Sequence, residues 1–112
     1  DFEFESIQVL RKDSLDMTDD DRQKIYDTVS GIENDKIVIT HGTDTILQTA
    51  EKLSDITSKT IILTGAMLPE KFSNSDAMFN LGTAVGAIEA LTPGVFIALR
   101  GKVVSWNNFH QQ

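Results

Sequence analysis

A regular alternation of short apolar runs with segments of helical period constrains this chain most. Three runs have the character of strands, at Lys36–Thr40, Thr60–Leu63 and Val95–Leu99. The first two read as buried strands of the parallel kind, because their apolar residues are continuous rather than alternating. Strands that alternate with helices form a parallel sheet joined by right-handed crossovers. The sequence therefore predicts a three-layer α/β fold, with a mostly parallel sheet and helices on both faces.

The helices are predicted from their start signals, stop signals and apolar spacing. Thr18, which precedes three aspartates, starts a helix that runs to about Ser30, with Gly31 as the stop. Two more helices are expected, at Thr45–Leu53 and Asp76–Leu91.

Two more elements complete the predicted order. Ser6–Leu10 reads as a short strand, and Arg100–Lys102 reads as a tight turn into a strand at Val103 and Val104. The 112 residues then suit a single domain with the order βαβαβαβ.

Composition narrows the classes of partner. The net charge of -7 argues against nucleic acid, because binding to a phosphate backbone needs a basic face. The chain has no cysteine, which excludes a thiolate nucleophile and a thiolate metal site. No apolar stretch approaches the ~20 residues of a membrane span, and the amino terminus lacks the pattern of a signal peptide. We therefore expect a globular, cytoplasmic protein that binds neither nucleic acid nor membranes.

The candidate site is the run His41-Gly42-Thr43-Asp44-Thr45, which directly follows a predicted strand. In open α/β sheets the loops at the carboxyl ends of strands face the ligand crevice. Thr43 and Asp44 would present a hydroxyl and a carboxylate there, and Gly42 would let the backbone approach a ligand closely. The alternative is structural, since Thr43 or Asp44 could cap the helix that begins here.

Parallel strands would bring further polar groups to this edge of the sheet. The loops after the first three predicted strands would place Ser14 and Gly65-Ala66-Met67 close to Thr43 and Asp44. Ser14 could donate a hydrogen bond to a substrate carboxylate, or it could belong only to a serine or aspartate turn.

Three other residues are interpreted as structural. His41 would orient the loop that follows it, and a metal site is not expected because His110 is distant in sequence. Met17 is interpreted as a packing residue, and Trp106 as a core or interface residue.

Several ordered segments together resemble the bacterial-type L-asparaginase/glutaminase family. They are Ile37 to Thr45, Leu63 to Met67 and Ser75 to Leu81, and Ser14 to Met17 is similar to the family's substrate-binding turn. The resemblance covers nearly the whole chain and corresponds to most of the family's amino-terminal domain.

The resemblance implies hydrolysis of a side-chain amide, such as that of L-asparagine, to a carboxylate and ammonia, with no metal or organic cofactor. Thr43 would be the second active-site threonine, and Asp44 would contact the amino group of the substrate. Ser14 would bind the α-carboxylate of the substrate, Ala66 would offer its backbone carbonyl near the leaving amide, and Gly42 would let the loop pass close to the ligand.

Departures from the family pattern keep three hypotheses open. The family's first motif, a strand and turn that supply the primary nucleophile, would lie before Asp1, and Gln111 stands near the position of the family's lysine. The chain is then a piece of an asparaginase-type amidohydrolase, a degenerate domain that binds a small amino acid or serves assembly, or part of the amidotransferase subunit for transfer-RNA-linked amidation. The chain alone is expected to have little or no activity. An exposed sheet edge also predicts a homo-oligomer.

Overall fold

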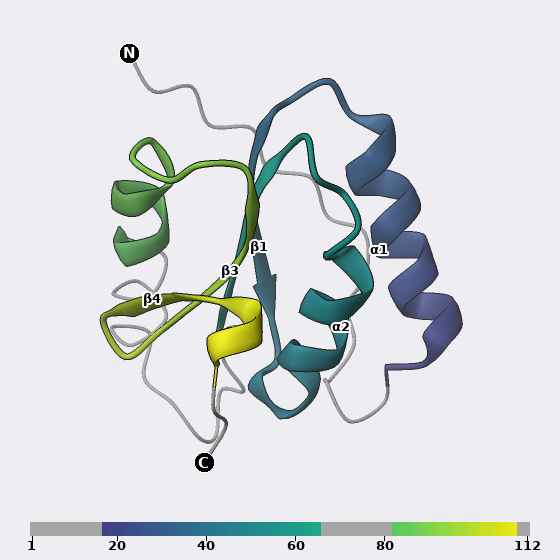
Figure 1. Cartoon of the computed structure of the whole chain (residues 1–112). Coiled ribbons are helices and arrows are strands. Elements are labelled where there is room, and N and C mark those ends of the chain that lie inside the picture. The colour runs from purple at the N-terminus through teal and green to yellow at the C-terminus, as the bar shows by residue number, and fades with distance from the viewer. Residues whose placement is uncertain (1–16, 66–81, 110–112) are drawn as a thin grey trace.

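The strands of the sheet follow one another across it in the order of the chain (Figure 1). They are β1 (Lys36–His41), β2 (Thr60–Gly65), β3 (Gly94–Leu99) and β4 (Lys102–Ser105). The structure is a computed structural model that describes residues 17–65 and 82–109. The predicted strand Ser6–Leu10 lies outside these ranges.

The sheet is parallel except for its last strand, which confirms the predicted fold class. β1 pairs with β2 and β2 pairs with β3 in parallel, whereas β4 runs antiparallel to β3. The predicted tight turn joins β3 and β4, and its two central residues, Arg100 and Gly101, have φ values of 56° and 78°. Positive φ at both positions is the requirement of a type I′ hairpin turn. Lys102, predicted as part of the turn, is instead the first residue of β4.

Helix α1 (Asp19–Gly31) begins where the sequence predicts and ends one residue later than predicted. The Thr18 hydroxyl accepts a hydrogen bond from the Asp21 backbone N–H at 3.1 Å, and the Asp21 carboxylate accepts one from the Thr18 N–H at 3.0 Å. This reciprocal pair is a capping box, and it satisfies donors that the first helical turn leaves unpaired. Gly31 is the last helical residue rather than the stop, and Ile32 closes the helix in an extended conformation.

The other two predicted helices are also present in the described residues. A short 3₁₀ turn, η2 (Thr43–Thr45), leads into α2 (Ile46–Leu53), so the helix starts one residue later than predicted. The third predicted helix, Asp76–Leu91, is helical at residues 82–88 and therefore ends earlier than predicted. Its residues 76–81 lie outside the described ranges.

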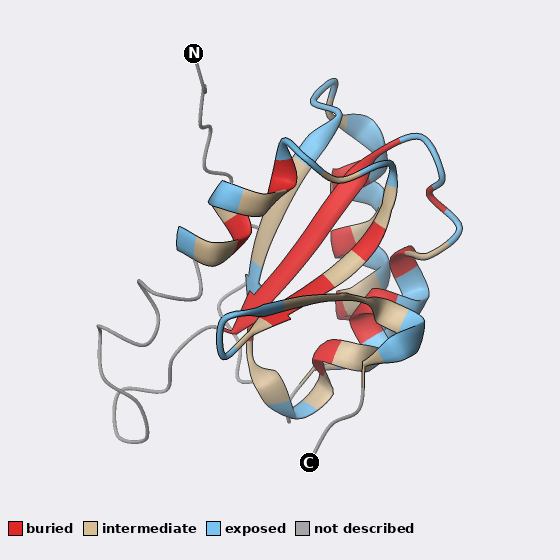
Figure 2. Cartoon of the chain, turned by 60° about the vertical axis from the view of Figure 1, so that its left-hand side comes forward, coloured by how far each residue is buried: buried red, intermediate tan, exposed pale blue. Residues whose placement is uncertain are grey.

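Helices cover both faces of the sheet, which confirms the predicted three layers (Figure 1). Ile61 and Leu63 of β2 pack with α1 and α2, whereas Ile62 packs with Ala84 and Ile88 of the helix at 82–88. This alternation follows from the two-residue period of a strand, which points successive side chains to opposite faces. Figure 2 shows the buried residues gathered along the middle of the sheet.

The prediction that β1 is a buried strand is wrong, while the same prediction for β2 is confirmed. Every residue of β2 is buried, but in β1 the residues from Ile37 to Ile39 are half-buried, Lys36 and Thr40 are exposed, and His41 is buried. The reason lies in position: among the described strands β1 pairs with β2 alone, whereas β2 has a neighbour on each side. A continuous apolar run identifies a strand without showing how central that strand is.

A buried lysine donates hydrogen bonds at the amino-terminal end of the sheet. Lys59, which is 8% exposed, directs its ammonium group to the backbone carbonyls of Ile32 and Asn34 at 2.7 and 2.6 Å. These carbonyls belong to the connection between α1 and β1, and Lys59 directly precedes β2. The lysine therefore ties that connection to the start of the central strand.

Replacing the Lys59 ammonium with an apolar end should destabilise the fold. We expect Lys59→Met to lower the free energy of unfolding by about 1–3 kcal/mol, because two backbone carbonyls lose a charged donor from a buried side chain while the aliphatic stem is kept. Urea denaturation of the variant and of the parent protein measures the change. Lys24→Met, at an exposed position on α1, is the matched control and should stay within about 0.5 kcal/mol of the parent. Equal losses in both variants would contradict the role of Lys59.

Candidate functional site

The turn after β1 leaves the sheet beside the end of β2. The two strands are in parallel register along their whole length, and the last pair in that register is His41 with Gly65. Parallel pairing therefore brings the run from Gly42 to Thr45 to the same edge at which β2 ends. Ser14 and Ala66, the other predicted substrate-binding residues, lie outside the described residues.

Thr43 and Asp44 lie in the 3₁₀ turn η2 rather than at the cap of a helix. Thr43 is half-buried and Asp44 is exposed. The cap position of α2 falls on Thr45, whose side chain makes no capping hydrogen bond. The structural alternative, in which Thr43 or Asp44 caps the helix, is therefore wrong.

Gly42 joins β1 to this turn in an extended conformation. Its φ of -62° and ψ of 143° are open to any residue, so the backbone angles do not explain the glycine. The prediction that Gly42 permits a close approach to a ligand stays a prediction.

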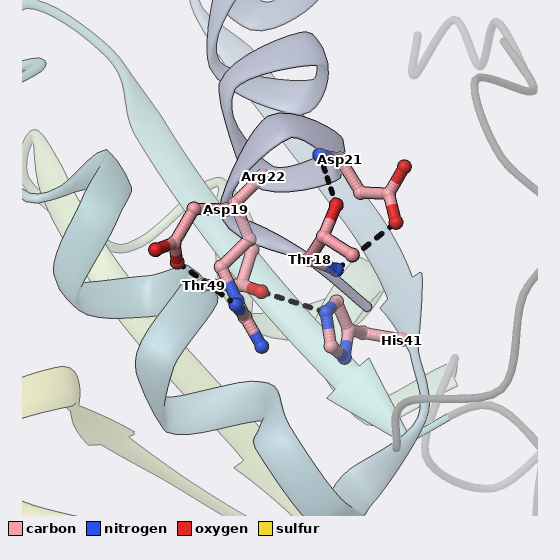
Figure 3. Close-up of polar contacts among 6 residues, drawn as sticks. All are labelled: Thr18, Asp19, Asp21, Arg22, His41 and Thr49. Carbon is pink, nitrogen blue, oxygen red and sulfur yellow. Dashed lines mark hydrogen bonds and ion pairs between the residues drawn. The ribbon is translucent and has the colours of Figure 1, made fainter. Parts of the chain in front are cut away.

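His41 is the buried polar residue of the site (Figure 3). It is 4% exposed, its Nδ1 lies 2.6 Å from the carbonyl oxygen of Gly42, and its Nε2 lies 2.8 Å from the hydroxyl oxygen of Thr49. A carbonyl oxygen can only accept, so Nδ1 carries the proton in this contact. In the neutral ring Nε2 is then the acceptor, and the Thr49 hydroxyl donates to it.

The surroundings of His41 favour the neutral ring. Burial lowers the pKa of His41, the hydrogen bond to the Gly42 carbonyl opposes that shift, and the positive charge of Arg22 lowers the pKa further. Figure 3 shows the Arg22 side chain beside Thr49 and His41. The Arg22 guanidinium pairs with the exposed Asp19 at 3.3 Å, and its buried Nε has no hydrogen-bond partner in the described part of the chain.

The sequence indicated His41 as the residue that orients the loop, but Thr49 and Arg22 were missed. The signal for Thr49 is present in the pattern of α2, where Ile46, Ala50 and Leu53 form the buried face. Thr49 follows Ile46 by three residues, so helical periodicity places its hydroxyl on that same face, where it needs a polar partner. Arg22 carried no such signal, because arginine is mostly exposed in proteins.

Residues 17–65 and 82–109 hold no group of three or more histidine, aspartate or glutamate side chains that could bind a metal ion. No helix within these ranges has the length and apolar character needed to cross a bilayer.

Comparisons with known proteins show what the chain is similar to. The family described as "Asparaginase, N-terminal" matches residues 1–111. An L-asparaginase of Thermococcus kodakarensis is 43% identical over 75 residues, which cover 64% of this chain and 23% of that protein. A glutaminase-asparaginase of Pseudomonas aeruginosa is 35% identical over 107 residues, which cover 88% of this chain and 30% of that protein.

A third relative carries a different name. It is a subunit of the glutamyl-tRNA(Gln) amidotransferase of Methanococcus vannielii, which is 41% identical over 76 residues that cover 64% of this chain and 18% of that protein. The chain therefore spans less than a third of the length of each of these three relatives.

The lowered pKa of His41 should make stability depend on pH. The unfolded chain has an ordinary histidine with a pKa of about 6.5, so between that value and the lowered pKa the unfolded state binds more protons than the folded state. The contribution of His41 to the free energy of unfolding is complete above pH ~6.5 and is lost as the pH falls through the lowered pKa.

Urea denaturation at a series of pH values compares the parent protein with His41→Asn. We expect the parent to lose stability more steeply than the variant as the pH falls from about 6.5, before most carboxylates titrate. His110 is present in both proteins, so its titration cancels from the difference. Parallel curves for the two proteins would contradict the lowered pKa.

Proposed function

We propose, since the chain belongs to the asparaginase family as an amino-terminal domain, that the turn after β1 is part of a site that hydrolyses L-asparagine to L-aspartate and ammonia. The supporting observation is the position of Thr43 and Asp44. They stand at the carboxyl edge of two parallel strands, and neither of them is the cap residue of α2. That edge is the usual ligand side of an open α/β sheet.

The proposed reaction is an acyl transfer. A threonine hydroxyl or an activated water attacks the amide carbon, the C–N bond breaks, and the nitrogen leaves as ammonia after it gains a proton. An acyl-threonine intermediate, where one forms, is released by water as the carboxylate. Backbone or side-chain donors must meet the negative charge that develops on the carbonyl oxygen.

Each predicted site residue has a separate proposed part. Thr43 supplies a hydroxyl at the reacting amide, and the exposed Asp44 carboxylate binds the substrate ammonium group. Ser14 is proposed to bind the α-carboxylate, and the Ala66 carbonyl to lie near the leaving amide, while Gly42 gives the ligand room. In this proposal a complete protein supplies the first threonine motif, and the chain alone has little activity.

Glutamine is the second candidate substrate. The name of one relative favours it, the glutaminase-asparaginase of Pseudomonas aeruginosa. Its side chain carries the same amide one methylene further from the α-carbon. A pocket distinguishes such a pair by only about 10–200-fold, so both amides belong in the same experiment.

Calorimetric titration with L-asparagine, and separately with L-glutamine, of a protein that carries this chain together with the first threonine motif tests the proposal. We expect sustained heat of hydrolysis that Thr43→Ala abolishes, because the substitution removes the hydroxyl proposed to lie at the reacting amide. Thr43→Ser, which keeps a hydroxyl, should retain part of the activity. Thr57→Ala, at an exposed position before β2, is the matched control and should hydrolyse the substrate at the parent rate.

The other outcomes separate the remaining hypotheses. Saturable heat without turnover would favour a degenerate domain that binds a small amino acid. Hydrolysis that survives in Thr43→Ala would remove Thr43 from the chemistry. Absence of heat with either amide, in a protein that also carries the first threonine motif, would overturn the proposed function.

A further inference from the structure

We propose that His41 is the positioning residue of the site, and that it holds the Gly42–Thr43 peptide in place with Thr49 as its support. The proposal starts from the contacts of the imidazole ring. Both ring nitrogens have a partner within 2.8 Å, and the ring is almost entirely buried. A group in this position acts on Thr43 and Asp44 through the backbone, without a contact to substrate.

The contact with Gly42 controls the orientation of a whole peptide unit. The carbonyl of Gly42 and the N–H of Thr43 belong to one planar, trans peptide. In a trans peptide the carbonyl and the N–H lie in the same plane and point in opposite directions. Because Nδ1 holds the Gly42 carbonyl toward the buried ring, the Thr43 N–H is directed away from the ring. The starting orientation of η2, which carries Thr43 and Asp44, is set by this plane.

The contacts with Gly42 and Thr49 together determine the orientation of the ring. A ring turned over would place a carbon near the Gly42 carbonyl and would lose a hydrogen bond of 2.6 Å. The Gly42 carbonyl, which can only accept, fixes the proton on Nδ1, and the Thr49 hydroxyl on α2 then donates to Nε2. The ring is thereby connected to α2, the helix that continues directly from the turn.

Of the charged side chains around the ring, Arg22 favours the neutral form. From α1, Arg22 adds a positive charge, and Asp19 pairs with that guanidinium from an exposed position. α1 also contributes the buried Asp21, which accepts the Thr18 N–H (Figure 3). From η2 comes Asp44, which is exposed.

The remaining elements place few charges near the ring. β2 carries no titratable side chain, and the charged residues of α2, Glu51 and Lys52, are exposed. A protonated ring would stand beside Arg22 and would force the Thr49 hydroxyl to accept instead of donate.

A matched pair of substitutions separates the two ring contacts. The amide nitrogen of asparagine is the same number of bonds from Cα as Nδ1 of histidine. His41→Asn therefore keeps a donor for the Gly42 carbonyl and loses the contact with the Thr49 hydroxyl. The amide of glutamine reaches as far as Nε2 of histidine. His41→Gln therefore keeps a partner for the Thr49 hydroxyl and loses the hydrogen bond to the Gly42 carbonyl. Both variants keep a polar group in the buried position, and urea denaturation verifies that each remains folded.

Nuclear magnetic resonance of the backbone measures the effect of each variant on the peptide that His41 contacts. The observed signals are the carbonyl carbon of Gly42 and the amide nitrogen of Thr43. We expect His41→Asn to keep both signals near their parent values and His41→Gln to move both. The Thr60 amide, which bonds to the Asp35 carbonyl at the other end of the sheet, is the internal control and should not move in either variant.

A pH titration gives a second readout that packing alone would not change. In the parent protein the Gly42 carbonyl signal should follow the titration of His41, with a midpoint below about 6.5. In both variants this titration should disappear. Unmoved Gly42 and Thr43 signals in a folded His41→Gln, or a Gly42 signal in the parent that does not respond to His41, would overturn the proposal.

The consequence for catalysis rests on the proposed function. In the protein with its first threonine motif, His41→Gln should lower kcat on the order of tenfold with little change in KM, less than the roughly 10²-fold cost of a 1 Å misplacement, and His41→Asn should restore most of it. Equal kcat in both variants and the parent would overturn the catalytic consequence. If the parent shows no turnover, the proposed function fails, and the resonance experiment still decides whether His41 holds the peptide.

Discussion

The parallel pairing of β1 with β2 is the interaction on which the site depends. Each residue from Lys36 to His41 has its register partner in β2, so both strands reach the same edge of the sheet together. A shift of the register by one residue would turn Ile61, Ile62 and Leu63 to the wrong faces of a strand that packs against helices on both sides. Burial of β2 on both faces therefore determines where the turn after β1 lies.

A buried side chain that hydrogen-bonds to backbone carbonyls of the neighbouring connection stands near each end of this strand pair. Lys59 holds two carbonyls before β1, and His41 holds the carbonyl that follows it. In both cases the hydrogen bonds to backbone oxygens satisfy a polar side chain that would otherwise be costly to bury. The difference lies in charge: the ammonium of Lys59 binds as a cation, whereas burial and Arg22 favour a neutral His41. We therefore expect the end of the pair with the candidate site to respond to mildly acidic pH through His41.

The fold was largely predictable from local patterns, and the site only in part. The start of α1 after Thr18, the burial of β2 and the turn at Arg100 each follow from neighbouring residues, so the sequence predicts them well. The exposure of β1 was not predictable, because it depends on how many strands pair with it. Thr49 was missed for a related reason: the pattern shows a threonine on a buried face without naming its partner.

The pairing of His41 with Thr49 links the geometry of the turn to the stability of α2. Thr49 is fully buried on the face of α2 that packs into the core, so it moves only when the helix moves. The ring connects this fixed hydroxyl to the Gly42 carbonyl, across the turn that carries Thr43 and Asp44. A half-buried turn at the edge of a sheet would otherwise belong to the less stable parts of a domain. Through His41, the packing of α2 into the core therefore stabilises the orientation of the turn that carries Thr43 and Asp44.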